Sequence, residues 1–427
     1  MTGSLLSRPL PLALAAATVF AASGAAFAQA DALPPAPPPV PAPGSQAATP
    51  VPLAYGISQK FTHESNLFRE TRGAEDDWAS TTALNLALDQ PLGRGKLRGT
   101  ASLQANRYGD HDELDNTGHD VDLALDVETA LNLAGTVGVR ASRQQYRYGL
   151  DSATPFDGKN IEDEQAAYVQ ARLGGMGVWS LLAGADTLER SYSQDAFADL
   201  NDLSQWSAEG GVGWRPSPDL GGTLKARYTR ISRPDSALGF GDDVGRREVE
   251  LALGWQASGA SRFEGRAARA KERHSVLDDR SFWTGGLAWD WMPAAKLHLR
   301  TELARDTEGA GGAQTSPEPS AQAVPAGDTL RDALRWSVQW AATAKVNVLA
   351  AAQYSERRLK ALVGGLPASA EDQTTALSLG VRWAPSRALD VGCELGREKR
   401  ETDSSLTVIT RPYELTTMGC SVAFWFR

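Results

Sequence analysis

The chain ends on the stretch TTMGCSVAFWFR, residues Thr416–Arg427, and this stretch decides the fold class. Side chains of an extended strand point alternately to opposite faces. One face here is small or polar apart from Trp425. The other face is apolar throughout and consists of Met418, Cys420, Val422, Phe424 and Phe426. Such a division is typical of a strand in an outer-membrane barrel, which meets lipid on one side and a wet lumen on the other.

The same alternation recurs along the chain from Leu53 onward. In the segment 120–127, Val and Leu alternate with Asp and Ala, and the segments 248–255, 297–304, 334–340 and 377–383 repeat the pattern. A period of two indicates half-exposed strands. Charged residues on one face need water, whereas the apolar face needs lipid or a second sheet. The sequence therefore predicts an all-β fold, a transmembrane antiparallel β-barrel over residues 53–427.

The connections between the predicted strands alternate in length. Short turns are expected near Pro91, Leu133, Met176, Pro216, Ser258, Pro293, Thr343 and Pro385. Long polar connections are expected at Gly109–Gly118, Asp151–Asn160 and Glu308–Gly327. Short periplasmic turns and long extracellular loops are the pattern of a barrel, here of about eighteen strands. Because this number is even, both termini are predicted at the periplasmic end. A β-sandwich is the alternative, but it has no reason to sort its connections by length.

Tryptophans mark the ends of the strands that run into short turns. They are Trp214, Trp255, Trp291, Trp340 and Trp383. Indole rings gather at membrane interfaces, where they form girdles. Three of these residues open a repeated Trp-x-Pro-Ser/Ala turn, in which proline ends a strand without removing a central ladder hydrogen bond. The tryptophans therefore support both a barrel and its orientation.

The first residues predict export. Arg8 precedes an apolar run that reaches Phe20, and the small-x-small site Ala26-Phe27-Ala28 follows. This is the pattern of a secretory signal peptide, residues 1–28, with a membrane anchor as the alternative. Residues 29–52 are rich in proline, which favours an extended polyproline II tether in the periplasm. The tether is either a plain spacer or a docking segment for a periplasmic partner.

Composition excludes some classes of function. The formal net charge is -9, and the mature chain would carry one positive charge fewer after Arg8 is removed. An acidic chain is a poor partner for nucleic acid. No later segment approaches the ~18 consecutive apolar residues that a membrane-spanning helix needs. The expected partners are instead outer-membrane lipid and lipopolysaccharide.

The stretch Glu64-Ser65-Asn66-Leu67-Phe68-Arg69 resembles an acidic-x-Asn-Leu-Phe-Arg motif of one outer-membrane family. These are the β-barrel proteins encoded in exopolysaccharide biosynthesis operons, within the broader β-barrel porin group. The resemblance implies export or assembly of an exopolysaccharide, with the polysaccharide and a periplasmic polysaccharide-export protein as partners. Barrels of this kind commonly end in an aromatic residue that the barrel-assembly machinery recognises. Here Arg427 follows Phe426, which puts the efficiency of insertion in question.

Charged residues on the polar strand phase are expected to line the lumen. The predicted wall comprises Arg98, Asp126, Arg140, Lys225, Arg227, Glu248, Glu250, Arg266, Arg300, Arg335 and Arg382. Facing residues of an antiparallel hairpin have a constant sum of numbers, so Arg227 is expected opposite Glu248 and Lys225 opposite Glu250. Opposite charges facing each other across strands stabilise a sheet by roughly 0.2–1 kcal/mol per pair. The wall is interpreted either as a salt-bridged scaffold or as a surface along which a polysaccharide slides, and both can hold together.

The two cysteines, Cys393 and Cys420, fall on the lipid-facing phase of the last two predicted strands. Their numbers centre a hairpin on a polar loop, which makes them candidates for a direct cross-strand disulfide. The periplasm permits disulfides. Two reduced thiols facing lipid are the alternative.

Catalytic patterns are poor. His111 lies between Asp110 and Asp112 in an acidic loop, but no serine motif accompanies it. We find no Cys/His metal pattern, P-loop or dinucleotide motif in the sequence, so no enzyme activity, metal or cofactor is predicted. Two function classes remain open besides a poorly supported enzyme. The first is exopolysaccharide export, and the alternative is a general or sugar-selective porin for uptake of small solutes.

Overall fold

The computed structural model describes residues 52–129, 132–146, 158–175, 177–233, 243–275, 279–308, 328–363, 366–403 and 410–426. The predicted signal peptide and almost all of the predicted tether, as well as Arg427, lie outside these residues. Most of the described chain forms strands. The strands are β1 (Leu53–Glu64), β2 (Asp77–Leu92), β3 (Gly95–Tyr108), β4 (Asn116–Glu128), β5 (Leu133–Gln145), β6 (Ile161–Leu173), β7 (Trp179–Tyr192), β8 (Leu203–Trp214), β9 (Leu220–Ser232), β10 (Val244–Ser258), β11 (Ser261–His274), β12 (Arg280–Ala294), β13 (Leu297–Glu308), β14 (Asp328–Trp340), β15 (Val346–Val363), β16 (Leu366–Trp383), β17 (Leu389–Thr402) and β18 (Tyr413–Phe426).

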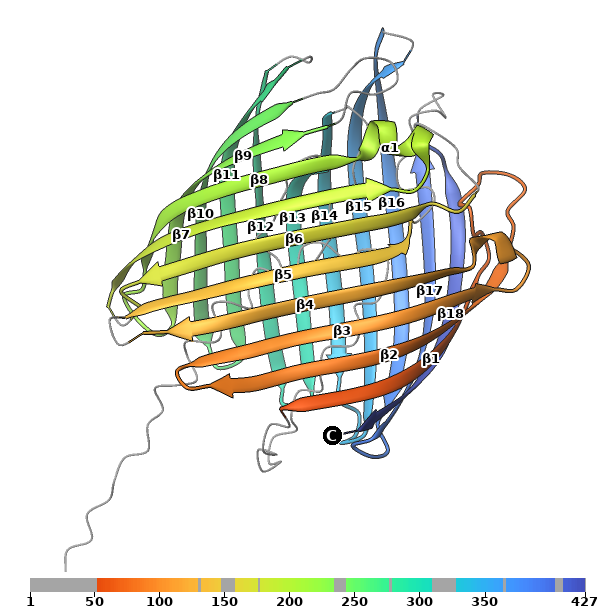
Figure 1. Cartoon of the computed structure of the whole chain (residues 1–427), viewed down its shortest axis with the longest axis horizontal. Coiled ribbons are helices and arrows are strands. Elements are labelled where there is room, and N and C mark those ends of the chain that lie inside the picture. The colour runs from red at the N-terminus through yellow and green to blue at the C-terminus, as the bar shows by residue number, and fades with distance from the viewer. Residues whose placement is uncertain are drawn as a thin grey trace, which may run out of the picture.

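These strands form one closed antiparallel barrel of 18 strands, as the sequence predicts. Each strand pairs with its neighbours in the chain, and β1 pairs with β18 over the register from Tyr55 opposite Phe426 to Glu64 opposite Thr417. Figure 1 shows these two strands side by side, although they are farthest apart in sequence. Closure matters because an open edge would leave backbone N–H and C=O groups without partners in lipid.

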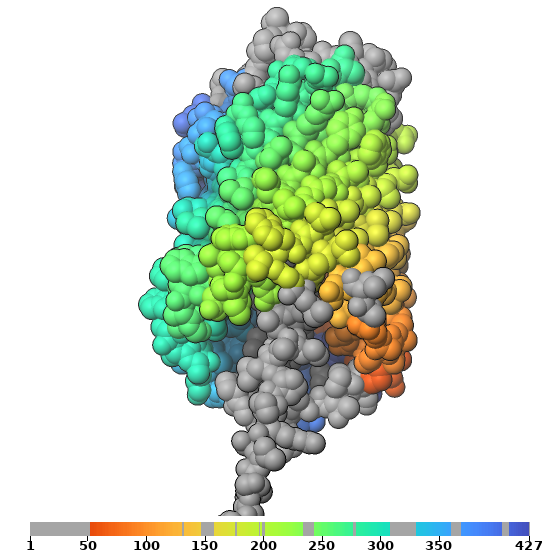
Figure 2. All heavy atoms as spheres, turned by 90° about the vertical axis from the view of Figure 1, so that its left-hand side faces the viewer, coloured from red at the N-terminus to blue at the C-terminus, as the bar shows by residue number. Residues whose placement is uncertain are grey.

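The outer surface carries a broad apolar belt. Leu103, Leu224, Leu251 and Leu379 are examples of outward side chains that stay exposed in the isolated barrel. All five tryptophans that were expected to end strands are also exposed at the short-turn end. Figure 2 shows the outer face as oblique bands of successive strands. An apolar belt edged by indoles is the surface that a membrane-spanning barrel presents to lipid. Among the described residues, no helix is long and apolar enough to cross a membrane.

The connections confirm the alternation of short and long, with two exceptions at the long-loop end. The connection between β11 and β12 spans only five residues, and β15 and β16, strands of 18 residues each, are joined by only two. Pro293 also differs from expectation: it lies in the irregular end of β12 rather than in the turn, where the register shifts between Trp291 and Ala294. Short helical segments occupy two long connections, η1 (Asp112–Leu114) and α1 (Asp195–Asn201).

Packing inside the barrel is uneven along its axis. At the long-loop end, Leu203, Ile231 and Val244 form a buried apolar cluster on the inner face, and Phe197 of α1 packs on Tyr146 and Tyr192 nearby. At the short-turn end, most inward side chains are half-buried, and some, such as those of Lys96 and Asp89, are exposed. The described lumen wall is therefore more densely packed towards the long-loop end.

Candidate solute pathway through the barrel

The predicted wall residues lie on nine strands, β3 to β5, β9 to β11, β13, β14 and β16, on the opposite phase from the exposed apolar belt. The register places Lys225 directly opposite Glu250, and their Nζ and Oε1 atoms are 3.7 Å apart. Lys225 also lies 3.5 Å from Glu209 on the other neighbouring strand. A cation on one strand thus joins the carboxylates of the strands on both sides.

Arg227 has the expected register but makes its ion pairs elsewhere. It lies directly opposite Glu248 in the register, but its guanidinium contacts Asp186 and lies 3.7 Å from Glu209. Glu248 is instead bonded by Arg246 from its own strand. The reason is that the arginine side chain is long enough to reach across β8 to Asp186 on β7, while Glu209 is its direct register partner on β8. Register alone therefore does not fix the ion pair.

Arg300 of β13 is the centre of the largest cluster of charges on the wall. Its guanidinium donates to Asp290 at 2.5 Å, also contacts Glu302, and lies 3.9 Å from Glu264. Arg335 of β14 approaches Glu302 at 4.0 Å and donates to Gln353 at 2.9 Å. One arginine therefore compensates several carboxylates, so its loss would leave a local excess of negative charge.

Arg266 belongs to the same network because it contacts Asp306 and lies 3.6 Å from Glu250. We call the inward arginines of this region the arginine ladder, which comprises Arg227 (β9), Arg246 (β10), Arg266 (β11), Arg300 (β13) and Arg335 (β14). The ladder binds carboxylates on strands from β7 to β13. Its charges are paired, so the wall presents no large field of one sign.

The remaining predicted wall residues form separate pairs. Arg98 donates to Asp126 at 2.8 Å, although the register puts Arg98 opposite Ala124 and Asp126 opposite Lys96. Arg140 donates to Asp122 at 2.7 Å, and these two are directly opposite. Arg382 of β16 donates to Asp390 of β17 at 2.7 Å. In these pairs, long side chains bind carboxylates that are either directly or diagonally opposite in the register.

Besides these charged pairs, a group of neutral polar side chains lies on the inner wall of β1 to β4. Asn85 donates to Ser58 at 3.0 Å, while Thr81 donates to Asn106 at 2.7 Å and Asn106 donates to Asn116 at 2.9 Å. We call these five residues the amide ladder. Hydroxyl and amide groups both donate and accept hydrogen bonds. They can therefore exchange bonds with the hydroxyl groups of a passing solute.

The exposure of charged pairs differs along the wall. Towards the long-loop end, the side chains of Arg357 and Asp372 are 4% and 0% exposed, and their atoms are 2.7 Å apart. Towards the short-turn end, Lys96 and Asp89 form a pair at 2.8 Å but are 50% and 45% exposed. The described wall is therefore packed more tightly around Arg357 and Asp372 than around Lys96 and Asp89.

The family-like stretch, Glu64–Arg69, lies where β1 meets β18. The side-chain amide of Asn66 donates to the backbone carbonyls of Glu70 and Glu414, at 2.8 and 3.1 Å. Leu67 packs on Leu114, with Phe68 beside them. Arg69 has a φ of 52°, which turns the chain there. These contacts give the stretch a local role, because it fastens the first long connection to the strand that closes the barrel.

A cluster that sequence reasoning missed lies beside this stretch. Asp77 is fully buried and accepts hydrogen bonds from the backbone N–H groups of Trp78, Gly109, Asp110 and His111. The ring of His111 lies 3.0 Å from Asp77 and 2.9 Å from Glu75. Although partial burial acts to lower it, the pKa of His111 is raised by its hydrogen bonds to the Glu75 and Asp77 carboxylates. The acidic loop was visible in the sequence, but its partner Asp77 lies 34 residues away.

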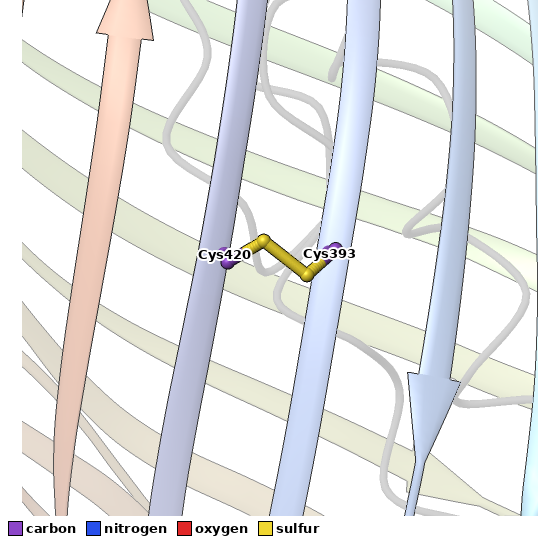
Figure 3. Close-up of a disulfide and its surroundings, with 2 residues drawn as sticks. All are labelled: Cys393 and Cys420. Carbon is purple, nitrogen blue, oxygen red and sulfur yellow. A yellow bond between two sulfur atoms is a disulfide. The ribbon is translucent and has the colours of Figure 1, made fainter.

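Cys393 and Cys420 are direct partners in the register of β17 and β18, and their sulfur atoms are bonded. Figure 3 shows the bridge joining the two neighbouring strands. Both residues lie on the outward phase, as the sequence predicts. In the described part of the chain, no group of three or more His, Cys, Asp or Glu side chains could hold a metal ion.

Comparison with known proteins separates fold from family. No family model matches the chain, and no curated protein matches it in sequence. Among solved structures, OpdK from Pseudomonas aeruginosa, an outer-membrane protein solved with vanillate, is 11% identical at a TM-score of 0.50, covering 88% of this chain and 99% of OpdK. The chain has the fold of outer-membrane porins. OccAB2 from Acinetobacter baumannii is 10% identical at a TM-score of 0.49, covering 88% of this chain and 98% of OccAB2.

The porin fold confirms the predicted barrel, but it does not show that the chain belongs to the narrower exopolysaccharide family. The structural neighbours support the β-barrel porin group and give no support to the exopolysaccharide family that Glu64–Arg69 resembles. The local fastening role of that stretch explains its residues without reference to a polysaccharide.

Proposed function

We propose that this chain is a diffusion channel of the outer membrane that lets small polar solutes, sugars among them, into the periplasm. The observation that carries the proposal is the difference in burial along the inner wall, from the exposed pair Lys96–Asp89 to the buried pair Arg357–Asp372, which we interpret as a constriction. A constriction lined by paired charges and amides suits solutes of a few ångströms. A wide polymer path would be expected to keep the inner face exposed along its length.

The lumen chemistry supports weak selectivity. The arginine ladder is compensated by carboxylates, so neither anions nor cations are strongly favoured. The amide ladder offers hydrogen bonds that a hydroxylated solute can form and break easily. Conduction requires binding that is weak enough for the solute to leave. OpdK, the neighbour solved with vanillate, is a barrel whose structure holds a small molecule of this size class. In this proposal the short turns, both chain ends and the tether 29–52 face the periplasm.

The test is solute entry into liposomes that carry the full mature chain. Swelling should be fast in glucose, slower in a trisaccharide and absent in a long dextran, because size at the constriction limits entry. Rapid entry of long dextran would contradict the proposal. Loss of surface exopolysaccharide in a deletion strain that grows normally on small sugars would favour the export function instead.

Ion selectivity tests the wall itself. Replacing Arg300 by Ala removes the cation shared by Glu264, Asp290 and Glu302, so the channel should become several-fold more selective for cations. The reversal potential in a potassium chloride gradient across a planar bilayer measures this. Arg397→Ala is the matched control, since that arginine lies outside the lumen and should leave the reversal potential unchanged. An equal shift in both variants would mean that Arg300 does not face the ion path.

A further inference from the structure

A dense group of basic side chains lies on the outer face of β10 and β11, towards the long-loop end. It consists of Arg247, Arg269, Lys271 and Arg273, and we call it the outer basic patch. All four are exposed and share the outward strand phase with the apolar belt. None of them can contribute to the lumen, so a solute channel does not account for them.

The register makes the patch unfavourable in isolation. Arg247 of β10 lies directly opposite Lys271 of β11, and like charges facing each other across strands are destabilising. Neither Arg247 nor Arg269 has an ion pair within the described ranges. Lys271 and Arg273 each approach Asp279, at 3.9 Å, and that carboxylate is itself half exposed. Four cations therefore share one distant anion in this part of the structure.

Several other outward charges at the same end of the barrel are paired with opposite charges. On β17 and β18, Lys399 lies 2.6 Å from Glu401 and Arg397 lies 3.4 Å from Glu414. On β13 and β14, Arg305 donates to both oxygens of Asp332 at 2.6 and 2.7 Å. The outer basic patch thus departs from the pattern of its surroundings, and the departure is consistent with an anionic partner from outside the chain.

The position of the patch identifies the kind of partner. Immediately nearer the membrane on β10 lie Val249 and Leu251, which are exposed and apolar. On β12 the exposed ring of Trp283 lies 5.3 Å beneath the guanidinium of Arg269, at a depth where indoles mark a membrane interface. A ligand here would meet cations at one end and lipid-facing side chains at the other. That is the chemistry of a lipid with a phosphorylated headgroup.

A shallow hollow of about 450 Å³ lies on the same face, over β12 to β15. Its outward walls include Leu287, Leu303, Leu334 and Tyr354, and its edge is the pair Arg305–Asp332. Gly285, which forms part of its floor, pairs with Ala267 of β11, so the hollow begins one strand away from the patch. An acyl chain could lie in the hollow while a phosphate contacts the patch.

We propose that the outer basic patch binds the phosphates of lipopolysaccharide, the phosphorylated glycolipid of the outer leaflet. Arginine and lysine supply charge-assisted hydrogen bonds to phosphate oxygens, and the bound anion relieves the repulsion between Arg247 and Lys271. The proposal rests on the long-loop end facing outward and not on which solute passes through the lumen.

The experiment measures binding of lipid A with two phosphates to the full mature barrel in detergent, by native mass spectrometry. Arg247→Gln with Lys271→Gln should weaken binding at least about tenfold, since each basic group near an anionic headgroup contributes substantially. Arg397→Gln with Lys399→Gln is the matched control, because it removes two cations from a balanced site, and it should retain wild-type binding. Lipid A stripped of phosphate should bind the wild type as weakly as the first variant does.

A single variant separates binding from folding. Lys271→Glu would give Arg247 an opposite charge, so the barrel in lipid-free detergent should resist heat at least as well as the wild type while binding lipid A more weakly. Equal losses in the two double variants would overturn the proposal. So would wild-type binding by Lys271→Glu, or equal binding of lipid A with and without its phosphates.

Discussion

The amide ladder of β1 to β4 and the arginine ladder of β9 to β14 line the same lumen with different chemistry, which is neutral in the first and charged in the second. Both fill the inner wall with polar groups and join neighbouring strands by side-chain bonds, such as Thr81 to Asn106 at 2.7 Å and Arg300 to Asp290 at 2.5 Å. A neutral hydrogen bond contributes only about 0.5–1.5 kcal/mol net, whereas one to a charged group contributes about 1.5–3 kcal/mol. We therefore expect the arginine ladder to hold the shape of the wall and the amide ladder to exchange hydrogen bonds with solutes.

The largest effect is expected where the charged wall is buried. Arg357→Ala should lower stability by about 3–5 kcal/mol, because it leaves the Asp372 carboxylate buried without its cation. The shift of the folded band on heated semi-native gels measures this. Arg358→Ala is the matched control on the outward phase of the same strand, where the side chain is 48% exposed and should matter little. Similar losses in both variants would show that burial does not distinguish the two sites.

The amide ladder should be less sensitive. Asn106→Ala removes the acceptor for Thr81 and a donor to Asn116, which is buried, so we expect a loss of about 1–3 kcal/mol. The same gels report the loss, and liposome swelling in glucose should slow while the reversal potential stays at the wild-type value. A change in ion selectivity would remove the distinction between the two ladders.

A double-mutant cycle sharpens the comparison at the level of one pair. Lys225→Glu alone places a third carboxylate beside Glu209 and Glu250, whereas adding Glu250→Lys restores opposite charges in the register. The coupling energy should be about 0.2–1 kcal/mol. Heat denaturation of the four proteins in the cycle measures it. A double variant no more stable than Lys225→Glu would argue against direct contact across β9 and β10.

The smallest effect should come from the His111 cluster above the amide ladder. Because the pKa of His111 is raised in the folded chain, protonation stabilises the cluster. This stabilisation is fully present below the ordinary value of 6.5 and is lost as pH rises through the raised pKa. The charged groups that act on the ring are Glu75, Asp77 and Glu113.

The heat resistance of His111→Gln should therefore differ most from the wild type at acidic pH and converge with it at alkaline pH. Circular dichroism melts at a series of pH values check this. A difference that grows with pH would show that the neutral ring holds the two loops together.

Local pattern alone predicted much of the fold. The alternation of apolar and polar residues identified the outward and inward side chains, because successive side chains of a strand point to opposite faces. The register of Lys225 with Glu250 and of Cys393 with Cys420 could be predicted, because the numbers of facing residues in an antiparallel hairpin add up to a constant. The strand number and the alternation of short and long connections followed from the same reasoning.

Only the tertiary structure decided which carboxylate each arginine binds. Arg227 binds Asp186 of β7 and approaches Glu209 of β8, although Glu248 of β10 is also its register partner, because its long side chain can reach carboxylates on several strands. It also decided that Asp77 meets His111 and that Asn66 reaches the carbonyl of Glu414, contacts between segments far apart in sequence. The direction of a strand's side chains alternates every two residues, so it can be predicted from the sequence. Contacts between residues far apart in sequence form only when the barrel closes.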